Sequence, residues 1–479
     1  MVRRAAVTGC ADGNLMTRVV TGAGALAALR PGGEAPGHRE ESPGRRFGRS
    51  DIPDDDGTLL RKGVPGRWWA GVHTGIWVAI SRVVAGVLIA HALLVLFPGA
   101  VIHSRLSLLS DGTWLGAFDR WDARYYTTIA LHGYPAHGPD VRAFFPGYPI
   151  VVRLASVVTG GFLGVARTAS LVSMVAFVLS AGLLWRLVGR HLGPRVALVS
   201  TTLFCWFPTS VFFLAPYSEA LFALEILMVA TLVGKERWWW AAVVAGYATA
   251  TSPEAVVLVA ALAATALAAR RGLARSIGYA AIGSAGGAAY VSYLGVRFDQ
   301  PFAFIDVQSD FHRVTSAPFA GVIENVGAIH HALAGRSPAL LGIPNLSAAA
   351  LWHNIAWMWS VDDVAIVLAV CALVALVAAA VRDRRYACPD RDAVPRSPVL
   401  WIYVLAGITL LVASTVVHGP GGPVSTESSA RLVSVAFPLY PGLALLMRRW
   451  QAPVAIGLGL CVGAALITQT LFTLGYWVT

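Results

Sequence analysis

Long apolar runs separated by short polar segments make up most of this chain. The runs predict membrane-spanning helices because they contain few charged residues and many are about as long as a helix that crosses a bilayer. The predicted spans lie at 77–101, 168–189, 196–214, 217–233, 238–252, 254–269, 277–296, 364–381, 399–417, 432–447 and 454–476. Several are shorter than the roughly 20 residues of a straight span, so some are predicted to pair as tight hairpins. The pattern predicts an all-α polytopic membrane protein with about 11 transmembrane helices.

Residues 1–66 differ from everything that follows. This segment is rich in Gly, Pro, Arg and acidic residues and has no sustained hydrophobic periodicity. Such a composition buries too little apolar surface to fold, so we expect a disordered cytoplasmic tail. A signal peptide near Met16 is the alternative, although its apolar core is short and rich in Gly and Ala. Residues 67–479 are predicted to form one membrane domain.

The composition agrees with a membrane protein. Of the 479 residues, 56% are hydrophobic and 13% are charged, whereas about 25% are charged in an ordinary soluble protein. Lys and Arg number 37 against 26 Asp and Glu, a net charge of +11. The basic residues lie in short clusters between apolar runs, which is typical of cytoplasmic helix ends and not of a nucleic-acid-binding surface. These properties exclude a soluble enzyme, a secreted disulfide scaffold and a transcription factor.

Five basic clusters set the predicted topology. They comprise Arg186, Arg190 and Arg195; Lys235 and Arg237; Arg270, Arg271 and Arg275; Arg382, Arg384, Arg385, Arg391 and Arg396; and Arg448 and Arg449. If all five are cytoplasmic, the N-terminus lies inside and the segments 102–144, 297–362 and 418–430 form outer loops. The apolar stretch 145–165 then has no room for a full crossing. We expect it to be a re-entrant or interfacial helix, or to pack within the outer loop.

The stretch Phe118–Pro149 contains the most informative polar residues. Its carboxylates Asp119 and Asp122 stand among Trp and Tyr residues, in a loop too apolar to be a solvated linker. Desolvation by such rings raises the basicity of a carboxylate, and a general base needs this property. Two plainer interpretations remain open: the aromatic residues form an ordinary interfacial belt, and the carboxylates pair with Arg120 and Arg124.

Three further carboxylates lie at or near predicted helix ends. Glu219 begins the span 217–233, where a carboxylate is favoured by the helix dipole. Glu225 lies within an apolar run, so we expect it to be neutral or paired. Glu254 follows Pro253 near the tip of a hairpin, where an N-terminal capping role is expected.

Other catalytic motifs are absent from the sequence. There is no Gly-rich phosphate loop, HExxH pair or nucleophilic Ser motif. The five cysteines have no spacing that indicates a zinc site or a disulfide framework. Gly pairs at 160–161 and 286–287 predict close packing between helices.

Four stretches of the chain resemble the PIG-V-like mannosyltransferases, the family of the second mannosyltransferase of GPI-anchor assembly and its bacterial relatives. The stretches are RWDARYYTTIALHGY followed by AFFPGYP, then FPTSVFFLAPYSEALFALEIL at 207–227, PFAFIDVQSDFHR at 301–313 and SARLVSVAFPLYPGLALL at 429–446. Each is weak alone, but together they follow the order of the family.

The resemblance implies a GT-C glycosyltransferase fold with its active site on the outer face of the plasma membrane. Such enzymes take a sugar, here expected to be mannose, from a polyprenyl-phosphate carrier and invert its anomeric centre. The essential Trp-Asp pair of the family corresponds to Trp121 and Asp122, so Asp122 is predicted to be the general base. Asp119 is the second candidate, since a helix would place it on the same face.

The leaving lipid phosphate requires positive charge in the site. Arg431 is the preferred phosphate contact because it lies at the outer end of a late span, where a buried cation usually indicates function. Snorkelling to the interface is its plainer interpretation. The remaining predicted substrate-binding residues are Trp121, Arg120, Arg124, Tyr125, Tyr126, Phe145, Tyr217, Glu219 and Arg313.

One stretch departs from the family pattern. Relatives have an Arg near 249–254, where this chain has Thr251 and Ser252. The donor phosphate is therefore bound by another cation, or the donor differs. No cofactor is expected and metal-independent transfer is predicted, with a divalent ion shared by Asp119 and Asp122 as the alternative.

Two other functions remain open at this point. A transporter or flippase of lipid-linked sugars is one, although transporters place ionisable residues near the midplane and here they gather in outer loops. A catalytically degenerate family member is the other. The expected partners are the polyprenyl-phosphate donor, a lipid or glycan acceptor and membrane lipids, and no nucleic acid.

Overall fold

The computed structural model describes residues 66–96, 115–135, 138–311, 313–324, 355–386, 396–418, 424–425, 428–448 and 451–475. Almost all of the predicted N-terminal tail lies outside the described residues, as do parts of the three predicted outer loops. The described residues belong to one unit of the chain.

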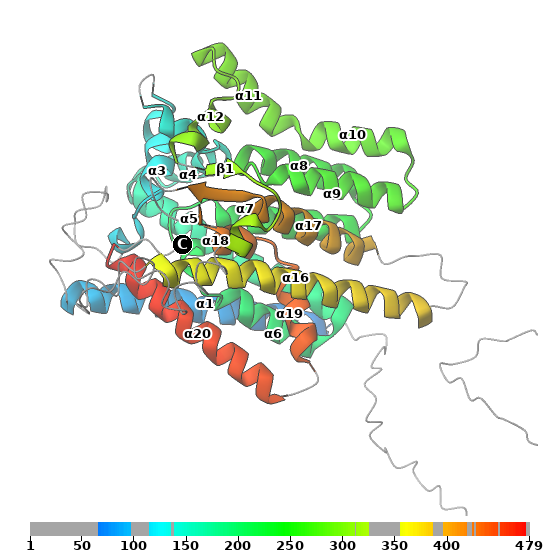
Figure 1. Ribbon diagram of the computed structural model, residues 1–479. Coiled ribbons are helices and arrows are strands. Elements are labelled where there is room, and N and C mark those ends of the chain that lie inside the picture. Colours follow the sequence, from blue (N-terminus) through cyan, green and yellow to red (C-terminus); the bar gives the residue numbers. More distant parts are fainter. Residues whose placement is uncertain are drawn as a thin grey trace, which may run out of the picture. The chain divides into compact units, whose positions relative to one another are not determined.

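Four described helices contain segments long and apolar enough to cross a membrane. They are α1 (Gly66–Leu96), α5 (Val165–Leu192), α16 (Ile355–Tyr386) and α20 (Gln451–Thr473), with apolar segments at Val72–Leu93, Val165–Leu192, Asp362–Arg382 and Gln451–Thr473. Helix α5 contacts α1, α6 and α7 (Figure 1). The predicted helical membrane protein is thus confirmed, while the number of about 11 spans stays a prediction.

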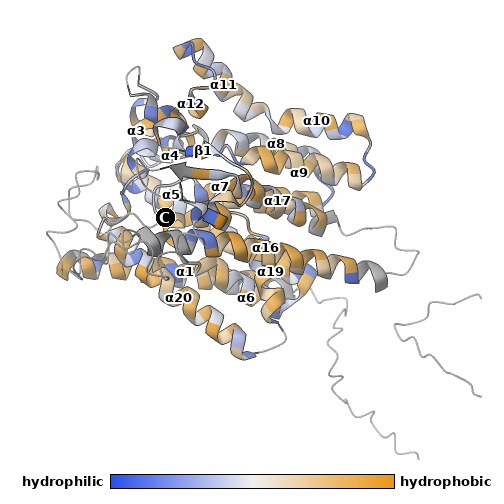
Figure 2. Ribbon diagram, viewed as in Figure 1, coloured by the Kyte–Doolittle hydropathy of each residue, from blue (hydrophilic) through white to orange (hydrophobic). Residues whose placement is uncertain are grey.

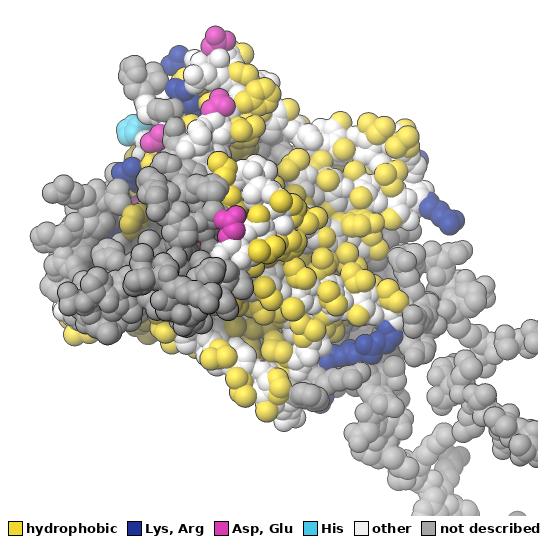
Figure 3. All heavy atoms as spheres, in the orientation of Figure 1, with side chains coloured by type: hydrophobic (Ala, Val, Ile, Leu, Met, Phe, Trp, Pro, Cys, Tyr) yellow, Lys and Arg dark blue, Asp and Glu magenta, His cyan; other side chains and the backbone are white. Residues whose placement is uncertain are grey.

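Shorter apolar helices fill the rest of the bundle. Those that match a predicted span in position are α7 (Glu219–Gly234), α8 (Trp238–Thr251), α9 (Ala255–Ala268) and α17 (Arg396–Ala413). Most of the residues in these helices are hydrophobic (Figure 2). In Figure 3 hydrophobic side chains cover the surface over α8, α9, α10 and α17, as expected of a face in contact with lipid.

Three predicted spans are broken in the structure. The span 196–214 divides into α6 (Pro194–Cys205) and the 3₁₀ turn η3 (Ser210–Phe213), because Pro208 disfavours helix before it. The span 432–447 divides into α18 (Ser429–Ser434) and α19 (Leu439–Met447) at Pro438. The span 277–296 divides into α10 (Leu273–Gly283) and α11 (Ala285–Phe298), where Gly and Ser lower helix propensity.

The predicted outer segments contain short helices and, together with the end of the predicted span 399–417, a small sheet. They hold η1 (Gly116–Phe118), α3 (Ala123–His132), η2 (Pro139–Ala143) and α12 (Ala303–Asp310). The antiparallel strands β1 (Arg313–Thr315), β2 (Thr415–His418) and β3 (Val424–Ser425) lie in the order β1-β2-β3, with Val314 opposite Val416. This small sheet was not predicted from the sequence, and its β-branched residues favour extended backbone.

Helix α4 (Gly147–Val158) occupies the stretch that was predicted not to cross. Its 12 residues are too few for a span. One face packs against α3 and α5, while Leu154, Val157 and Val158 are exposed. An amphipathic helix of this kind agrees with the prediction of an interfacial element.

The two Gly pairs have different roles. A Cβ on Gly286 would lie 2.1 Å from the carbonyl oxygen of Gly246, so the predicted close packing of α11 on α8 is confirmed there. Gly160 and Gly161 instead have φ of 63° and 72° with no atom within 4 Å of an added Cβ. They form the turn after α4, because left-handed backbone favours glycine.

A buried arginine ties α1 to the last helix. Arg82 is fully buried and donates hydrogen bonds to Ser210 Oγ and Gln469 Oε1, both at 3.1 Å. Helix α20 otherwise exposes most of its apolar segment. The hydrogen bond from Arg82 to Gln469 therefore attaches the C-terminal half of α20 to the bundle.

Candidate active site

A cavity of about 910 Å³ lies where α3, α7, α18 and the β1 strand meet. Its wall contains seven of the predicted site residues: Trp121, Asp122, Tyr126, Phe145, Glu219, Arg313 and Arg431. These residues come from four stretches that are far apart in the sequence. The fold therefore brings together most of the predicted site.

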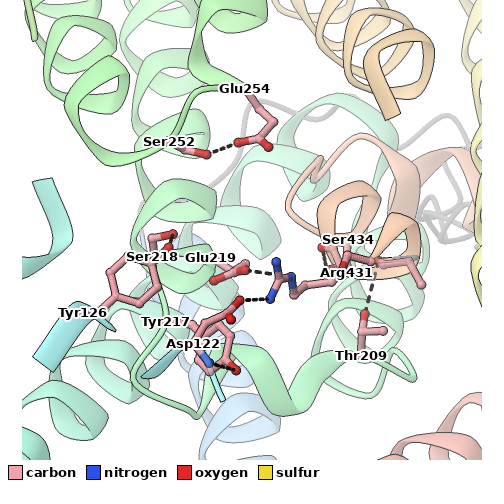
Figure 4. A network of polar contacts seen from close by, with 12 residues as sticks. Asp122, Tyr126, Thr209, Tyr217, Ser218, Glu219, Ser252, Glu254, Arg431 and Ser434 are labelled. Atoms are coloured by element: carbon pink, nitrogen blue, oxygen red, sulfur yellow. Dashed lines mark hydrogen bonds and ion pairs between the residues drawn. The ribbon is translucent and has the colours of Figure 1, made fainter. Parts of the chain in front are cut away.

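Arg431 connects two carboxylates at the centre of this cavity. Its Nη1 lies 2.9 Å from Asp122 Oδ2, and its Nε lies 3.2 Å from Glu219 Oε1 (Figure 4). The Arg431 side chain is only 8% exposed, against 23% for Asp122. Burial disfavours the charged guanidinium, but Glu219 and Asp122 outweigh this and raise the pKa of Arg431. The cation and both anions thus form one buried unit.

A strained turn presents Asp122 to the cavity. Trp121 has φ of 53°, a left-handed conformation that costs a residue with a Cβ about 1–2 kcal/mol. The Tyr217 hydroxyl bridges this residue: it accepts from the Asp122 N–H at 3.2 Å and donates to the Arg120 carbonyl at 3.1 Å. Tyr217 is fully buried behind the cavity wall. Its position indicates support of the turn, in contrast to the substrate contact predicted from sequence.

Helix α18 positions Arg431. Ser428, with φ of 68°, precedes the helix, and Asp362 Oδ1 accepts a hydrogen bond from the Ala430 N–H at 2.6 Å. The Ser434 hydroxyl donates to the Arg431 carbonyl at 2.6 Å. Sequence reasoning missed Asp362 because it placed this residue at the end of a loop. An acidic residue next to a long apolar run was the available signal.

Besides Tyr217, four predicted residues lie outside the cavity wall: Asp119, Arg120, Arg124 and Tyr125. Asp119 is fully buried, and Arg120 donates to the Thr473 carbonyl at 3.2 Å. Burial lowers the pKa of Arg120, which the neighbouring Asp119 partly offsets. Arg124 donates to the Tyr125 hydroxyl at 3.2 Å. Asp122 thus lines the cavity whereas Asp119 does not, and a divalent ion shared by the two stays the alternative.

Aromatic rings form one side of the cavity. The Tyr126 hydroxyl shares a hydrogen bond of 2.8 Å with Ser218 Oγ, and burial raises the pKa of Tyr126 well above 10. Tyr125 stacks on Phe144 at 4.5 Å between ring centroids. Sequence reasoning missed Phe144 and Ser218, although each adjoins a predicted residue. Rings of this kind pack against the apolar faces of sugars or lipids.

The α8–α9 turn closes the opposite side. The Thr251 hydroxyl donates to Glu225 Oε1 at 2.8 Å, which gives Glu225 the partner predicted for it. Ser252 donates to the Glu254 carboxylate. Glu254 occupies the N-cap position of α9 but makes no capping hydrogen bond, so its predicted role is corrected. Thr251, Ser252 and Glu254 all line the cavity.

The cavity has more acid than base. Asp122, Glu219, Glu254 and Asp306 line it together with Arg313 and Arg431. Arg313 donates to Gln308 Oε1 at 3.3 Å and to Ser428 Oγ at 3.4 Å. Within the described residues no group of three or more His, Cys, Asp or Glu side chains is arranged to hold a metal ion.

Part of this site lies within a stretch that matches a known family. Residues 95–269 match the family model described as Mannosyltransferase (PIG-V). The chain is 38% identical to mouse GPI alpha-1,6-mannosyltransferase 2 over 117 residues, which are 23% of each chain. For the human protein the identity is 33% over 118 residues, 23% of this chain and 24% of that one. The chain thus matches about a quarter of the length of these relatives, and the resemblance predicted from sequence is confirmed.

Solved structures show a partial likeness. A crystal structure of the Archaeoglobus fulgidus oligosaccharyltransferase with Zn and sulfate has a TM-score of 0.40 at 13% identity, covering 83% of this chain and 53% of that chain. A second structure of that enzyme, tethered to an acceptor peptide, has a TM-score of 0.39 at 10% identity and covers 83% and 55%. The GT-C assignment stays a prediction.

Proposed function

We propose that this protein is a membrane glycosyltransferase that moves a sugar, mannose as the first candidate, from a polyprenyl-phosphate carrier to a hydroxyl of a lipid or glycan acceptor. The family match over 95–269 supports mannosyl transfer, and the matched stretch contains Trp121, Asp122 and Glu219. The observation that carries the proposal is the Asp122 carboxylate, which lines a large cavity and is held by Arg431.

The proposed reaction is a direct displacement with Asp122 as the base. Asp122 takes the proton of the acceptor hydroxyl while the hydroxyl oxygen forms a bond to the anomeric carbon. The bond from that carbon to the phosphate oxygen breaks on the opposite face, and its electron pair leaves with polyprenyl phosphate. A single displacement inverts the anomeric centre. A positioned base contributes about 10²–10⁴ in rate.

Arg313 is the proposed contact for the leaving phosphate. Arg431 also lines the cavity, but its Nη1 and Nε already face two carboxylates. Arg313 lines the cavity from β1, where it donates to the neutral oxygens Gln308 Oε1 and Ser428 Oγ. A guanidinium matches phosphate geometry and stabilises the charge that develops as the carbon–oxygen bond breaks. Arg431 is then proposed to orient Asp122.

The cavity also has an apolar edge that suits a lipid chain. Val256, Val314 and Leu411 line it, yet their side chains are 61%, 44% and 40% exposed. Residues that are both lining and exposed mark a place where the cavity reaches the surface. An amphiphilic donor fits this arrangement, with its phosphate at Arg313 and its chain along the apolar edge.

We propose that the reaction requires no metal ion. The Arg431 guanidinium lies between Asp122 and Glu219, where a divalent cation would otherwise bridge the two carboxylates. Transfer is therefore expected to continue in EDTA at the untreated rate. Loss of transfer in EDTA, with recovery on addition of Mg²⁺ or Mn²⁺, would contradict this part of the proposal.

The cavity is proposed to face the outside of the plasma membrane, with the N-terminus inside. Its walls include α3, α12 and β1, all from segments predicted to be outer loops. The α9–α10 turn and the C-terminal ends of α16 and α19, which carry basic clusters, lie on the other side of the bundle in Figure 1. This separation supports the proposed orientation.

The test measures transfer of radiolabelled mannose. Membranes that contain the full chain are incubated with polyprenyl-phospho-mannose and a lipid and glycan extract. Asp122→Asn is expected to lower transfer about 10²–10⁴-fold, while Glu324→Gln, an exposed carboxylate outside the cavity, leaves it unchanged. Unchanged transfer in Asp122→Asn contradicts the base assignment. Absence of transfer from every polyprenyl-phosphate sugar overturns the enzyme proposal in favour of a transporter or an inactive relative.

A further inference from the structure

The α8–α9 turn presents the side chains of Thr251, Ser252 and Glu254 to the cavity. The two hydroxyls already donate hydrogen bonds to carboxyl groups. The Thr251 hydroxyl donates to Glu225 Oε1 at 2.8 Å, behind the cavity wall. The Ser252 hydroxyl donates to the Glu254 carboxylate. A hydroxyl has one proton and two lone pairs, and a carboxylate has acceptors only. The three groups together therefore offer the cavity hydrogen-bond acceptors and no donor.

Glu225 is the buried partner of the Thr251 hydroxyl. Glu225 is 3% exposed, and among the described residues its Oε2 has no hydrogen-bond partner. If the Thr251 hydroxyl turned toward the cavity, it would break its hydrogen bond to the buried Glu225 carboxyl. The Thr251 oxygen is thus held at the cavity wall by a buried partner.

An acceptor-only surface selects its ligand by charge and hydrogen bonding. A phosphate brings acceptors and negative charge, so Glu254 repels it. A polyhydroxylated ring brings several donors that match the three acceptors. The arginine proposed for phosphate, Arg313, lies on β1, a separate element of the cavity wall. The groups proposed for hydroxyls and for phosphate therefore come from separate elements of the cavity wall.

We infer that Thr251, Ser252 and Glu254 form a subsite that binds the hydroxyls of a sugar or polyol ring and so orients the substrate in the cavity. This inference rests on the proposed glycosyl transfer. The ring belongs either to the donor sugar or to the acceptor, since the two share the same chemistry. Glu254 is the specificity-determining residue because it carries the charge.

The first arm measures binding to the purified full chain. The probes are polyprenyl-phospho-mannose and polyprenyl phosphate, which differ only in the sugar. If the ring is that of the donor, Glu254→Gln weakens binding of polyprenyl-phospho-mannose about tenfold or more, since a hydrogen bond to a charged group is lost. Binding of polyprenyl phosphate stays unchanged. Asp299→Asn, an acid-to-amide change outside the cavity at a left-handed position that Asn tolerates, leaves both unchanged.

The second arm measures transfer as the acceptor concentration is varied. If the ring is that of the acceptor, Glu254→Gln raises the acceptor KM by a similar factor and leaves donor binding unaltered. The inference is overturned if Glu254→Gln changes neither donor binding nor acceptor KM, or if it weakens both lipid probes equally. Failure of the wild-type chain to transfer sugar counts against the proposed function, while the binding arm still tests the subsite.

Discussion

Arg431 determines the electrostatic state of the cavity at the scale of single residues. It holds Asp122 and Glu219 in one buried unit, and both carboxylates depend on it for compensation of charge. Removal of one partner from a buried ion pair leaves an uncompensated charge, which costs about 3–5 kcal/mol. Arg431 therefore affects stability as well as chemistry, and its variants must be assessed for both.

We predict that Arg431→Ala is destabilised more strongly at neutral pH than at acid pH. As the pH rises, the variant ionises Glu219 in a buried place that has lost its cation, whereas at acid pH this group keeps its proton and the cost falls. Thermal unfolding of the purified chain in detergent at several pH values measures the difference from wild type. Arg431→Lys keeps the positive charge and is expected to lose less stability than Arg431→Ala. A gap between Arg431→Ala and wild type that is independent of pH would argue against the buried unit.

We predict that Tyr217→Phe lowers kcat while the donor KM changes little. The hydroxyl that bridges Arg120 and Asp122 is lost, so the left-handed turn at Trp121 relaxes and Asp122 leaves its position. Hydrogen exchange of the peptide around Asp122 is expected to increase, because the Asp122 N–H loses its acceptor. Tyr290→Phe removes a buried hydroxyl that donates to the Arg142 carbonyl instead. The positioning role is refuted if both variants behave alike.

The site residues also show how much of the site can be predicted from the sequence. Asp122, Glu219 and Arg431 were each identified as candidates, yet their pairing depends on tertiary structure that no local pattern contains. Asp119 and Asp122 were expected on one helical face. The chain there is a 3₁₀ turn followed by a left-handed residue, so the two carboxylates diverge and Asp119 lies outside the cavity wall.

Short elements carry the site, and the sequence predicted these least well. The span 432–447 was expected to be continuous, but Pro438 separates α18 from α19, and this break leaves Arg431 on a six-residue helix. Strands β1 and β2 are three and four residues long and about a hundred residues apart. Hydrophobic periodicity cannot detect pairing over such a distance. Long apolar helices were predicted well because their signal is local.

We predict that Asp362→Ala weakens the attachment of α18. The variant loses the acceptor for the Ala430 N–H, a contact comparable to a helix cap, which contributes about 0.5–2 kcal/mol. Transfer falls because Arg431 adjoins Ala430. Asp362→Asn keeps an oxygen at the same place and is expected to retain most stability and activity. Unfolding temperature and kcat measured on both variants test this prediction. Equal losses in the two variants would show that the negative charge of Asp362 matters, and not the oxygen that accepts from the Ala430 N–H.

Basic and acidic residues are distributed differently along the chain, and the two groups have different proposed roles. The predicted cytoplasmic clusters account for much of the excess of 37 basic over 26 acidic residues. The cavity has the reverse balance, with four acids and two arginines along its wall. In the proposed orientation the positive charge marks the cytoplasmic side, and the acidic cavity is proposed to select an uncharged, hydroxyl-rich ligand beside one phosphate. The net charge alone reveals neither role.

This separation predicts the accessibility of single cysteines in intact cells. In a background without the five native cysteines, Glu324→Cys is expected to react with a membrane-impermeant maleimide from outside, since it follows β1 and is exposed. Lys235→Cys, exposed in the turn between α7 and α8, is expected to react only after permeabilisation. A helix bundle cannot move these charged ends across lipid once inserted, because each charge costs about 2.5–3.5 kcal/mol at the bilayer centre. The reverse labelling pattern would place the cavity inside the cell, where a polyprenyl-phosphate donor would have to be bound from the inner leaflet.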